Sequence, residues 1–312
     1  MTVEGATIPR AEVTSYYGRP VLKQPVWAPE IPFYFFTGGL AGASAGLALG
    51  AGLAGHDELA RRAWLNAFAG IAVSPPLLIS DLGRPERFLN MLRLFKVTSP
   101  MSVGSWVLAG SGLVTTIATA DAWTGLVPAV LARPARPLAG ALGLPLVTYT
   151  AALLANTAVP AWHEARRTLP FVFAASAAMS AGGAAVLTTP VAAAAPARRL
   201  AIGGAAASAA AVELMSHRLG ALGTPYRTGA ACTLKRAATG LTLAGAGLIA
   251  GAGHRRAAAA AGGALLMAAA ACERWSVFRA GFQSAADPEA TIGPQRARIA
   301  AGERQGAIRR KK

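Results

Sequence analysis

Eight long apolar runs, separated by short polar segments, constrain the fold of this 312-residue chain more than any other feature. A helix needs about 20 mostly apolar residues to cross a bilayer, and each run has roughly that length. We therefore expect an all-α integral membrane protein with eight transmembrane helices. The runs cover residues 31–54, 62–80, 102–121, 138–160, 168–190, 199–216, 235–253 and 256–275.

Composition supports this interpretation. Hydrophobic residues make up 54% of the chain and charged residues only 14%, whereas about a quarter of the residues in a soluble domain are charged. Several runs are rich in Ala and Gly, which let membrane helices approach one another closely. We expect three segments: an N-terminal tail at 1–30, one packed transmembrane domain at 31–278, and a basic C-terminal tail at 279–312.

The net charge of +16 does not indicate a nucleic-acid-binding protein. Basic residues come in pairs at the ends of apolar runs, as at Arg61-Arg62 and Arg255-Arg256. This distribution is typical of loops that flank membrane helices and meet lipid headgroups. Aromatic and basic residues do not alternate in the way that a base-stacking surface requires. The positive charge therefore indicates contact with the lipid membrane and not with nucleic acid.

The chain carries few residues that could bind a redox metal. Cys232 and Cys272 form no metal-spaced cluster, so we expect no iron–sulfur cluster in this chain and no other metal. A transmembrane b-type haem needs histidines inside two facing spans. All four histidines fall at the ends of runs or in loops, so we also expect no haem. These histidines are His56, His163, His217 and His254.

An even number of spans places both termini on one face of the membrane, together with every second loop. That face receives the loop beginning at Asp81, the loop carrying His163 and the loop after His217, which hold the unusual polar residues. We therefore expect one partner and one site on this face. It also receives 22 of the 30 Lys and Arg residues, so the positive-inside rule favours a multi-pass cell-membrane protein with cytoplasmic termini.

The loop after the second run is unusually rich in large apolar and basic residues. Apolar side chains between Phe88 and Phe95 alternate with Arg87, Arg93 and Lys96. This pattern is typical of an amphipathic helix lying at a membrane surface. We expect such a helix here, with the three basic residues available for docking a partner.

The stretch from Ser80 to Trp106, which contains Ser-Asp-Leu-Gly-Arg-Pro-Glu-Arg-Phe, resembles the signature loop of the NrfD / polysulfide-reductase membrane-subunit family. The resemblance implies a quinone-reactive membrane anchor of an oxidoreductase complex, packed as two four-helix bundles. It implies bound quinone, with menaquinone as the expected form. It also implies a ferredoxin-like iron–sulfur subunit and a molybdopterin catalytic subunit as partners in electron transport and anaerobic respiration.

The fourth run carries hydrogen-bonding side chains spaced by seven residues, namely Tyr149, Asn156 and His163. On a continuous helix this spacing places them along one face, where they could bind quinone oxygens and conduct protons. The family resemblance implies that Tyr149 borders the quinone. The alternative is that Tyr149 and Asn156 only bond neighbouring helices. In the first run, Tyr34 and Thr37 are the obvious polar side chains.

Ionisable residues beside the spans are further candidates, because burying them is costly. Asp81 either accepts protons beside the quinone or forms a structural ion pair with Arg84. The resemblance implies that the turn containing both residues lies near the quinone and the iron–sulfur partner. Glu213 and His217, four residues apart, either form a proton route or stabilise their helix as a pair.

A proton-linked or small-solute transporter is the alternative function. Such a protein should show broken helices and polar residues near mid-membrane in both halves. The second half of this chain has few polar residues at mid-span, which favours the oxidoreductase subunit.

Overall fold

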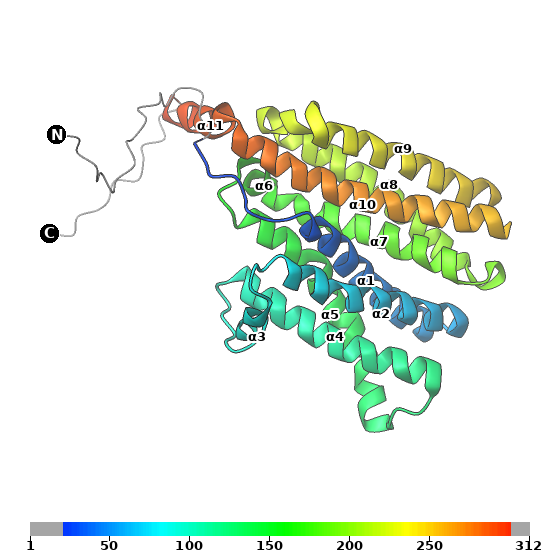
Figure 1. Cartoon of the computed structure of the whole chain (residues 1–312). Helices are drawn as coiled ribbons and strands as arrows, with labels where there is room; N and C mark the ends of the chain where they lie inside the picture. Colours follow the sequence, from blue (N-terminus) through cyan, green and yellow to red (C-terminus); the bar gives the residue numbers. More distant parts are fainter. Residues whose placement is uncertain (1–20, 301–312) are drawn as a thin grey trace, which may run out of the picture.

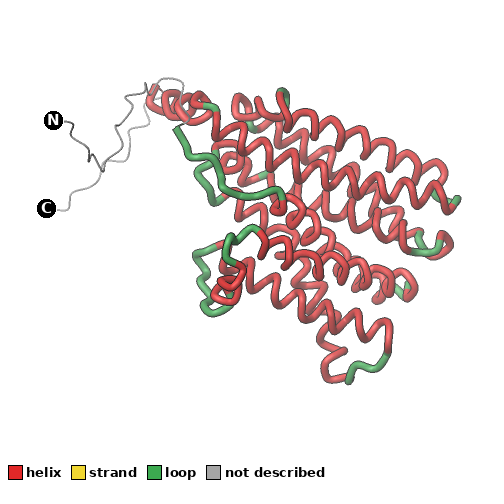
Figure 2. Tube along the Cα trace, viewed as in Figure 1, coloured by secondary structure: helices red, strands yellow, loops and turns green. Residues whose placement is uncertain are grey.

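The computed structural model describes residues 21–300, and this part of the chain is helical without strands (Figures 1 and 2). Eight long helices follow the eight apolar runs. They are α1 (Glu30–Leu53), α2 (Asp57–Ser80), α4 (Pro100–Thr124), α5 (Ala129–Ala155), α7 (Leu169–Thr188), α8 (Ala195–Arg218), α9 (Gly229–Ala252) and α10 (Arg256–Ala286). The two expected tails lie partly outside the described residues, at 1–20 and 301–312.

Six of these helices, α1, α2, α4, α5, α7 and α8, are long and apolar enough to cross a membrane. The expectation of an all-α membrane protein is therefore confirmed. Helices α9 and α10 have sufficient length, but charged residues lie within them and lower their hydropathy: Lys235 and Arg236 in α9, and Glu273 and Arg274 in α10.

Helix α1 lies at the centre of the molecule. It packs against α2 and α5 on one side and against α7 and α10 on the other, while α10 also packs along α9 (Figure 1). A Cβ atom on Gly42 of α1 would lie only 2.6 Å from the carbonyl oxygen of Gly143 in α5. Glycine at this crossing therefore lets the two helix backbones touch, as the small residues of the first run predict.

Short helices gather at one end of the molecule, which we call the terminal end (Figure 1). It comprises residues 81–99, 156–168, 219–228 and 287–300. Its short helices are η1 (Pro85–Arg87), α3 (Phe88–Met91), α6 (Pro160–Glu164), η2 (Ala165–Arg167), η4 (Gly220–Tyr226) and α11 (Pro288–Ala300). Trp27 stacks on Trp162 with ring centroids 5.4 Å apart, and so fixes the segment before α1 to this end. The even number of long helices places these loops on one side.

The expected amphipathic helix over residues 88–95 is only partly present. Helix α3 ends at Met91, and residues 94–96 have no regular secondary structure. The side chain of Ser102 causes this ending, because its Oγ donates to the carbonyl oxygen of Leu94 at 2.9 Å and accepts from the amide of Lys96 at 3.0 Å. These bonds satisfy backbone groups that a longer helix would have used.

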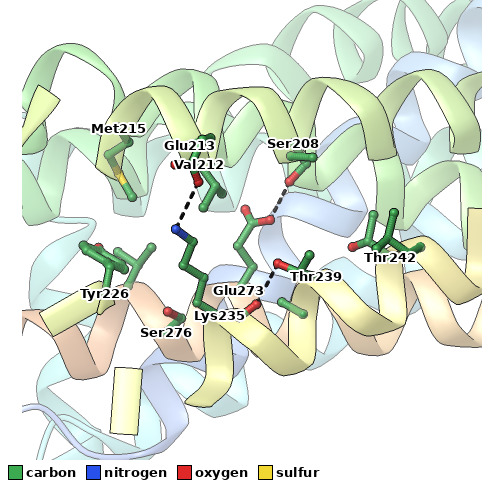
Figure 3. A pocket seen from close by; sticks show the side chains of 14 residues that line it. Ser208, Val212, Glu213, Met215, Tyr226, Lys235, Thr239, Thr242, Glu273 and Ser276 are labelled. Atoms are coloured by element: carbon green, nitrogen blue, oxygen red, sulfur yellow. Dashed lines mark hydrogen bonds and ion pairs between the residues drawn. The ribbon is translucent and has the colours of Figure 1, made fainter. Parts of the chain in front are cut away.

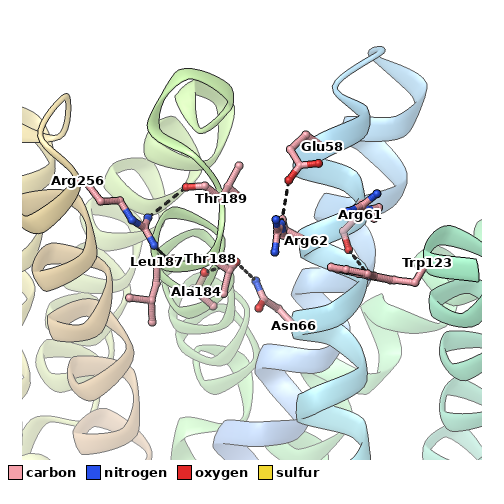
Figure 4. Close-up of polar contacts among 10 residues, drawn as sticks. All are labelled: Glu58, Arg61, Arg62, Asn66, Trp123, Ala184, Leu187, Thr188, Thr189 and Arg256. Atoms are coloured by element: carbon pink, nitrogen blue, oxygen red, sulfur yellow. Dashed lines mark hydrogen bonds and ion pairs between the residues drawn. The ribbon is translucent and has the colours of Figure 1, made fainter.

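The opposite end of the molecule, where η3 (Val191–Ala193) lies, is held by structural contacts (Figure 4). Arg256 donates to the carbonyl oxygens of Val186, in the last turn of α7, and of Thr189, which follows the helix, each at 3.2 Å; the C-terminal end of a helix is a favourable place for a cation. Glu58 and Arg62 form an ion pair one turn apart in α2. These interactions join and cap helices, and none of them requires a ligand.

Candidate functional site

Asp81 follows the last residue of α2 and faces the start of α1. Its Oδ1 accepts a hydrogen bond of 2.7 Å from the backbone amide of Ala28. Burial raises the pKa of Asp81, and the charge of Glu30 raises it further, whereas the bond from Ala28 opposes both effects. Gly83, with φ +64°, then turns the chain away from α2. Asp81 is thus a half-buried carboxyl group that can hold a proton more readily than an exposed one.

A small cavity of about 50 Å³ lies beside Asp81, between α1, α2, α4 and α5 at the terminal end. We call it the Asp81 cavity. Its polar lining consists of Asp81, Tyr34, Tyr149 and Ser105. Its walls are otherwise apolar and aromatic: Trp27, Ile31, Phe35, Leu78, Leu82, Met91, Met101 and Leu153. The cavity therefore combines one acid and two phenols in an apolar surrounding.

The two tyrosines of the cavity come from different helices and meet edge to face. Their ring centroids are 6.5 Å apart with an interplanar angle of 62°. The Tyr149 ring occupies the space beside Gly104 of α4 that a Cβ atom there would need. The hydroxyl of Tyr34 is buried and has no hydrogen-bond partner among residues 21–300. A ligand or water is expected at such a group, because an unpaired buried hydroxyl is costly.

The predicted continuous face of Tyr149, Asn156 and His163 is wrong. Helix α5 ends at Ala155, and His163 lies in the separate helix α6. The chain turns because Thr157 donates to the carbonyl oxygen of Leu154 at 2.7 Å, and Pro160 then begins a new helix. Asn156 and His163 are both exposed and do not line the Asp81 cavity.

The basic residues of the signature loop are exposed. Arg84 is not among the residues that line the Asp81 cavity, and the ion pairs found within residues 21–300 do not include one between Asp81 and Arg84. Arg87, Arg93 and Lys96 also face outward. The carboxyl group of Asp81 is therefore available to the cavity rather than engaged by Arg84.

Glu213 lies at a second, separate cavity between α8, α9 and α10 (Figure 3). Its Oε2 accepts a hydrogen bond of 3.2 Å from Nζ of Lys235 in α9. The partner of Glu213 in the structure is therefore Lys235, on another helix. His217 is exposed and is not part of this cavity.

Tyr34 was not among the site residues chosen from the sequence. Its signal was weak, because one tyrosine near the start of an apolar run is typical of membrane helices in general. Only the packing of α1 against α2 and α5 places its hydroxyl group in the same cavity as Asp81 and Tyr149.

A family model described as polysulfide reductase matches residues 13–286. The chain belongs to the polysulfide reductase family. This confirms the resemblance drawn from residues Ser80 to Trp106, and it identifies the chain as a membrane subunit of a redox complex. The comparison with curated proteins gives no match. All residues that line the Asp81 cavity lie within residues 13–286, which the family model matches. The helices that form the cavity precede α6 in the chain.

Proposed function

We propose that this polysulfide reductase family protein is the quinone-reactive anchor of its complex and exchanges electrons between membrane quinone and an iron–sulfur subunit. One observation carries the proposal: Asp81, Tyr34 and Tyr149 lie around a single cavity at the terminal end. In this proposal all eight long helices span the membrane as two four-helix bundles, α1, α2, α4 and α5 in one and α7 to α10 in the other.

The chemistry of the cavity suits a quinone head group. Each carbonyl oxygen of a quinone accepts hydrogen bonds, which the phenol groups of Tyr34 and Tyr149 can donate. Reduction to the quinol takes up two electrons and two protons. The electrons come from the iron–sulfur subunit, and protons reach the ring from water through Asp81. The raised pKa of Asp81 brings the group closer to the range in which it can both accept and release protons.

The cavity must widen before a quinone ring can enter. A volume of about 50 Å³ holds one or two water molecules, since each water occupies about 30 Å³ in the liquid. Met91 and Met101 form part of its wall, and Met101 is 48% exposed. Methionine side chains adapt easily to new shapes. We propose that the ring enters by displacement of these two side chains.

The same end of the molecule offers a surface for the iron–sulfur subunit. Arg87, Arg93 and Lys96 are exposed there, and Leu89 and Leu94 beside them are 73% and 70% exposed. We propose that the ferredoxin-like subunit docks on this mixed basic and apolar surface and that a molybdopterin subunit binds in turn to it. Menaquinone is the expected quinone, and the cytoplasm is the expected side of the terminal end.

Photolabelling of the complex in membranes with an azido-substituted quinone tests the site. We expect labelled peptides from the wall of the Asp81 cavity, especially around Met91 and Met101, and we expect excess unmodified quinone to prevent the labelling. Labelling confined to α9 and α10 would contradict the proposed site.

A further inference from the structure

The cavity between α8, α9 and α10, which we call the α8–α10 cavity, has a volume of about 220 Å³. Figure 3 shows its lining. Apolar side chains such as Val212, Leu243 and Val277 form most of the wall, and polar side chains enter from every surrounding element. The polar residues include Ser208, Glu213, Tyr226, Lys235, Glu273 and Ser276.

Glu273 is the most unusual of these residues because its carboxyl group is inside the helix bundle. It is 7% exposed, and its Oε2 accepts a hydrogen bond from Oγ of Ser208. Its Oε1 forms no hydrogen bond of normal geometry within residues 21–300, although the side chain of Ser176 in α7 lies near the carboxyl group, and the buried hydroxyl group of Tyr226 has no partner in this part of the chain either. Both groups line the same cavity. Because buried polar atoms without partners are costly, the cavity is expected to hold water that bonds to them.

A charged pair connects this cavity to the surface. Lys235 donates to Glu213 and to Oγ of Ser216, each over 3.2 Å. The side chain of Lys235 is 22% exposed and that of Glu213 is 75% exposed. Polar groups therefore line the cavity from the buried carboxyl group of Glu273 to the exposed Glu213.

The charge nearest to Glu273 on α10 is that of Arg274, whose side chain points toward α7. Its guanidinium lies 3.7 Å from the ring centroid of Phe173 in α7 and donates to the Phe173 carbonyl oxygen at 2.7 Å. The positive charge of Arg274 favours an ionised Glu273 from a distance, and Arg274 does not line the cavity. A protonated Glu273 can instead donate to cavity water.

We propose that the α8–α10 cavity is a water-filled proton-exchange site whose proton-binding group is Glu273. A proton passes from cavity water to Oε1 of Glu273, and that water regains a proton from solvent at the Lys235–Glu213 pair; release follows the reverse path. No electron is transferred. The charged and titratable groups that surround Glu273 are Glu213 from α8, Lys235 from α9, Tyr226 from η4 and Arg274 from α10. The site is separate from the Asp81 cavity and does not depend on quinone.

Dicyclohexylcarbodiimide tests this proposal, because this apolar reagent adds covalently to protonated carboxyl groups that it can reach from the membrane. The full chain in its native membranes is treated at a series of pH values, and the adducts are mapped by peptide mass spectrometry. We expect an adduct on Glu273 that decreases as the pH rises. It should be absent in Glu273→Gln and retained in Glu213→Gln. Absence of the adduct at every pH, or an adduct that does not change with pH, would overturn the proposal.

A matched pair of variants separates the cavity from general effects on the helix. Ala238 lines the cavity and is buried, whereas Ala237 beside it is exposed. Ala238→Leu should fill the cavity and reduce labelling of Glu273 on the order of tenfold, while Ala237→Leu should leave labelling unchanged. Equal labelling in the two variants would show that the reagent does not reach Glu273 through this cavity and would also contradict the proposal.

Discussion

Asp81 at the end of α2 is bonded to the backbone amide of Ala28, 53 residues earlier in the chain, at 2.7 Å. This bond fixes the segment before α1 against α2, and Asp81 also lines the cavity that Tyr34 and Tyr149 line. Asp81 therefore has a structural role through its bond to Ala28 and a proposed role in proton transfer. Substitutions must distinguish these two roles.

Asp81→Asn makes this distinction. The amide oxygen of Asn can still accept the bond from Ala28, so the chain should fold, but it cannot relay protons. We expect slower quinone-linked turnover, with a loss of about 10²-fold or more where proton transfer limits the rate. The loss should be larger at high pH, where free protons are scarce. A variant with wild-type turnover across the pH range would exclude Asp81 as a proton acceptor.

The raised pKa of Asp81 also predicts a pH dependence of stability. A group whose pKa is higher in the folded chain than in the unfolded chain stabilises the fold at low pH, and this contribution is lost as the pH rises through the folded-state pKa. Thermal unfolding in detergent should therefore show the wild type losing stability relative to Asp81→Asn as the pH rises above the ordinary carboxyl range. A constant difference over that range would argue against desolvation of Asp81.

The contact between α1 and α5 gives a prediction about packing. A Cβ atom at Gly42 would meet the carbonyl oxygen of Gly143 at 2.6 Å, whereas one at Gly46 would meet nothing within 4 Å. Gly42→Ala should destabilise the protein by about 1–3 kcal/mol because backbone atoms must move. Gly46→Ala is the matched control and should be neutral or slightly stabilising. Similar melting temperatures for the two variants would contradict the close approach.

Cysteine crosslinking tests the docking surface. A crosslinker attached at Arg87→Cys, on the exposed signature loop, should capture the iron–sulfur subunit in intact membranes. Thr124→Cys, at the end of α4 on the opposite side of the molecule, is the control. Capture at Thr124 but not at Arg87 would place the partner at the wrong end for this proposal.

The sequence predicted the long helices well, because a hydrophobic run long enough to span a membrane can satisfy its backbone hydrogen bonds in few structures other than a helix. It also identified Asp81 and Tyr149, which the fold brings to one cavity. It failed where local side-chain bonds decide the backbone: Ser102 ends the surface helix, and Thr157 ends α5. These bonds depend on the position of single hydroxyl groups, which no hydrophobic period encodes.

The buried charges were harder to interpret from the sequence. Glu273 and Arg274 lie near the end of the last apolar run and are typical of residues that flank a span. In the structure α10 continues to Ala286, so the two residues are inside the helix and are buried. Their burial depends on the length of α10, and the apolar run at 256–275 gave a helix that was too short.

In the proposed site the hydroxyl group of Tyr149 donates a hydrogen bond to a quinone in the Asp81 cavity. Tyr149→Phe removes this group and keeps the ring against Gly104, so folding should be preserved. A lost hydrogen bond costs about 0.5–1.5 kcal/mol, and up to about 3 kcal/mol where the acceptor stays buried. Quinone-linked turnover should therefore fall between about twofold and a hundredfold.

The decisive measurement compares two activities of the same Tyr149→Phe membranes. Electron transfer from the substrate of the catalytic partner to a water-soluble dye bypasses the membrane subunit and should stay at the wild-type level, while quinone-linked turnover should fall. Wild-type rates for both activities would contradict the account and would leave the Tyr149 hydroxyl group with a role in helix packing only.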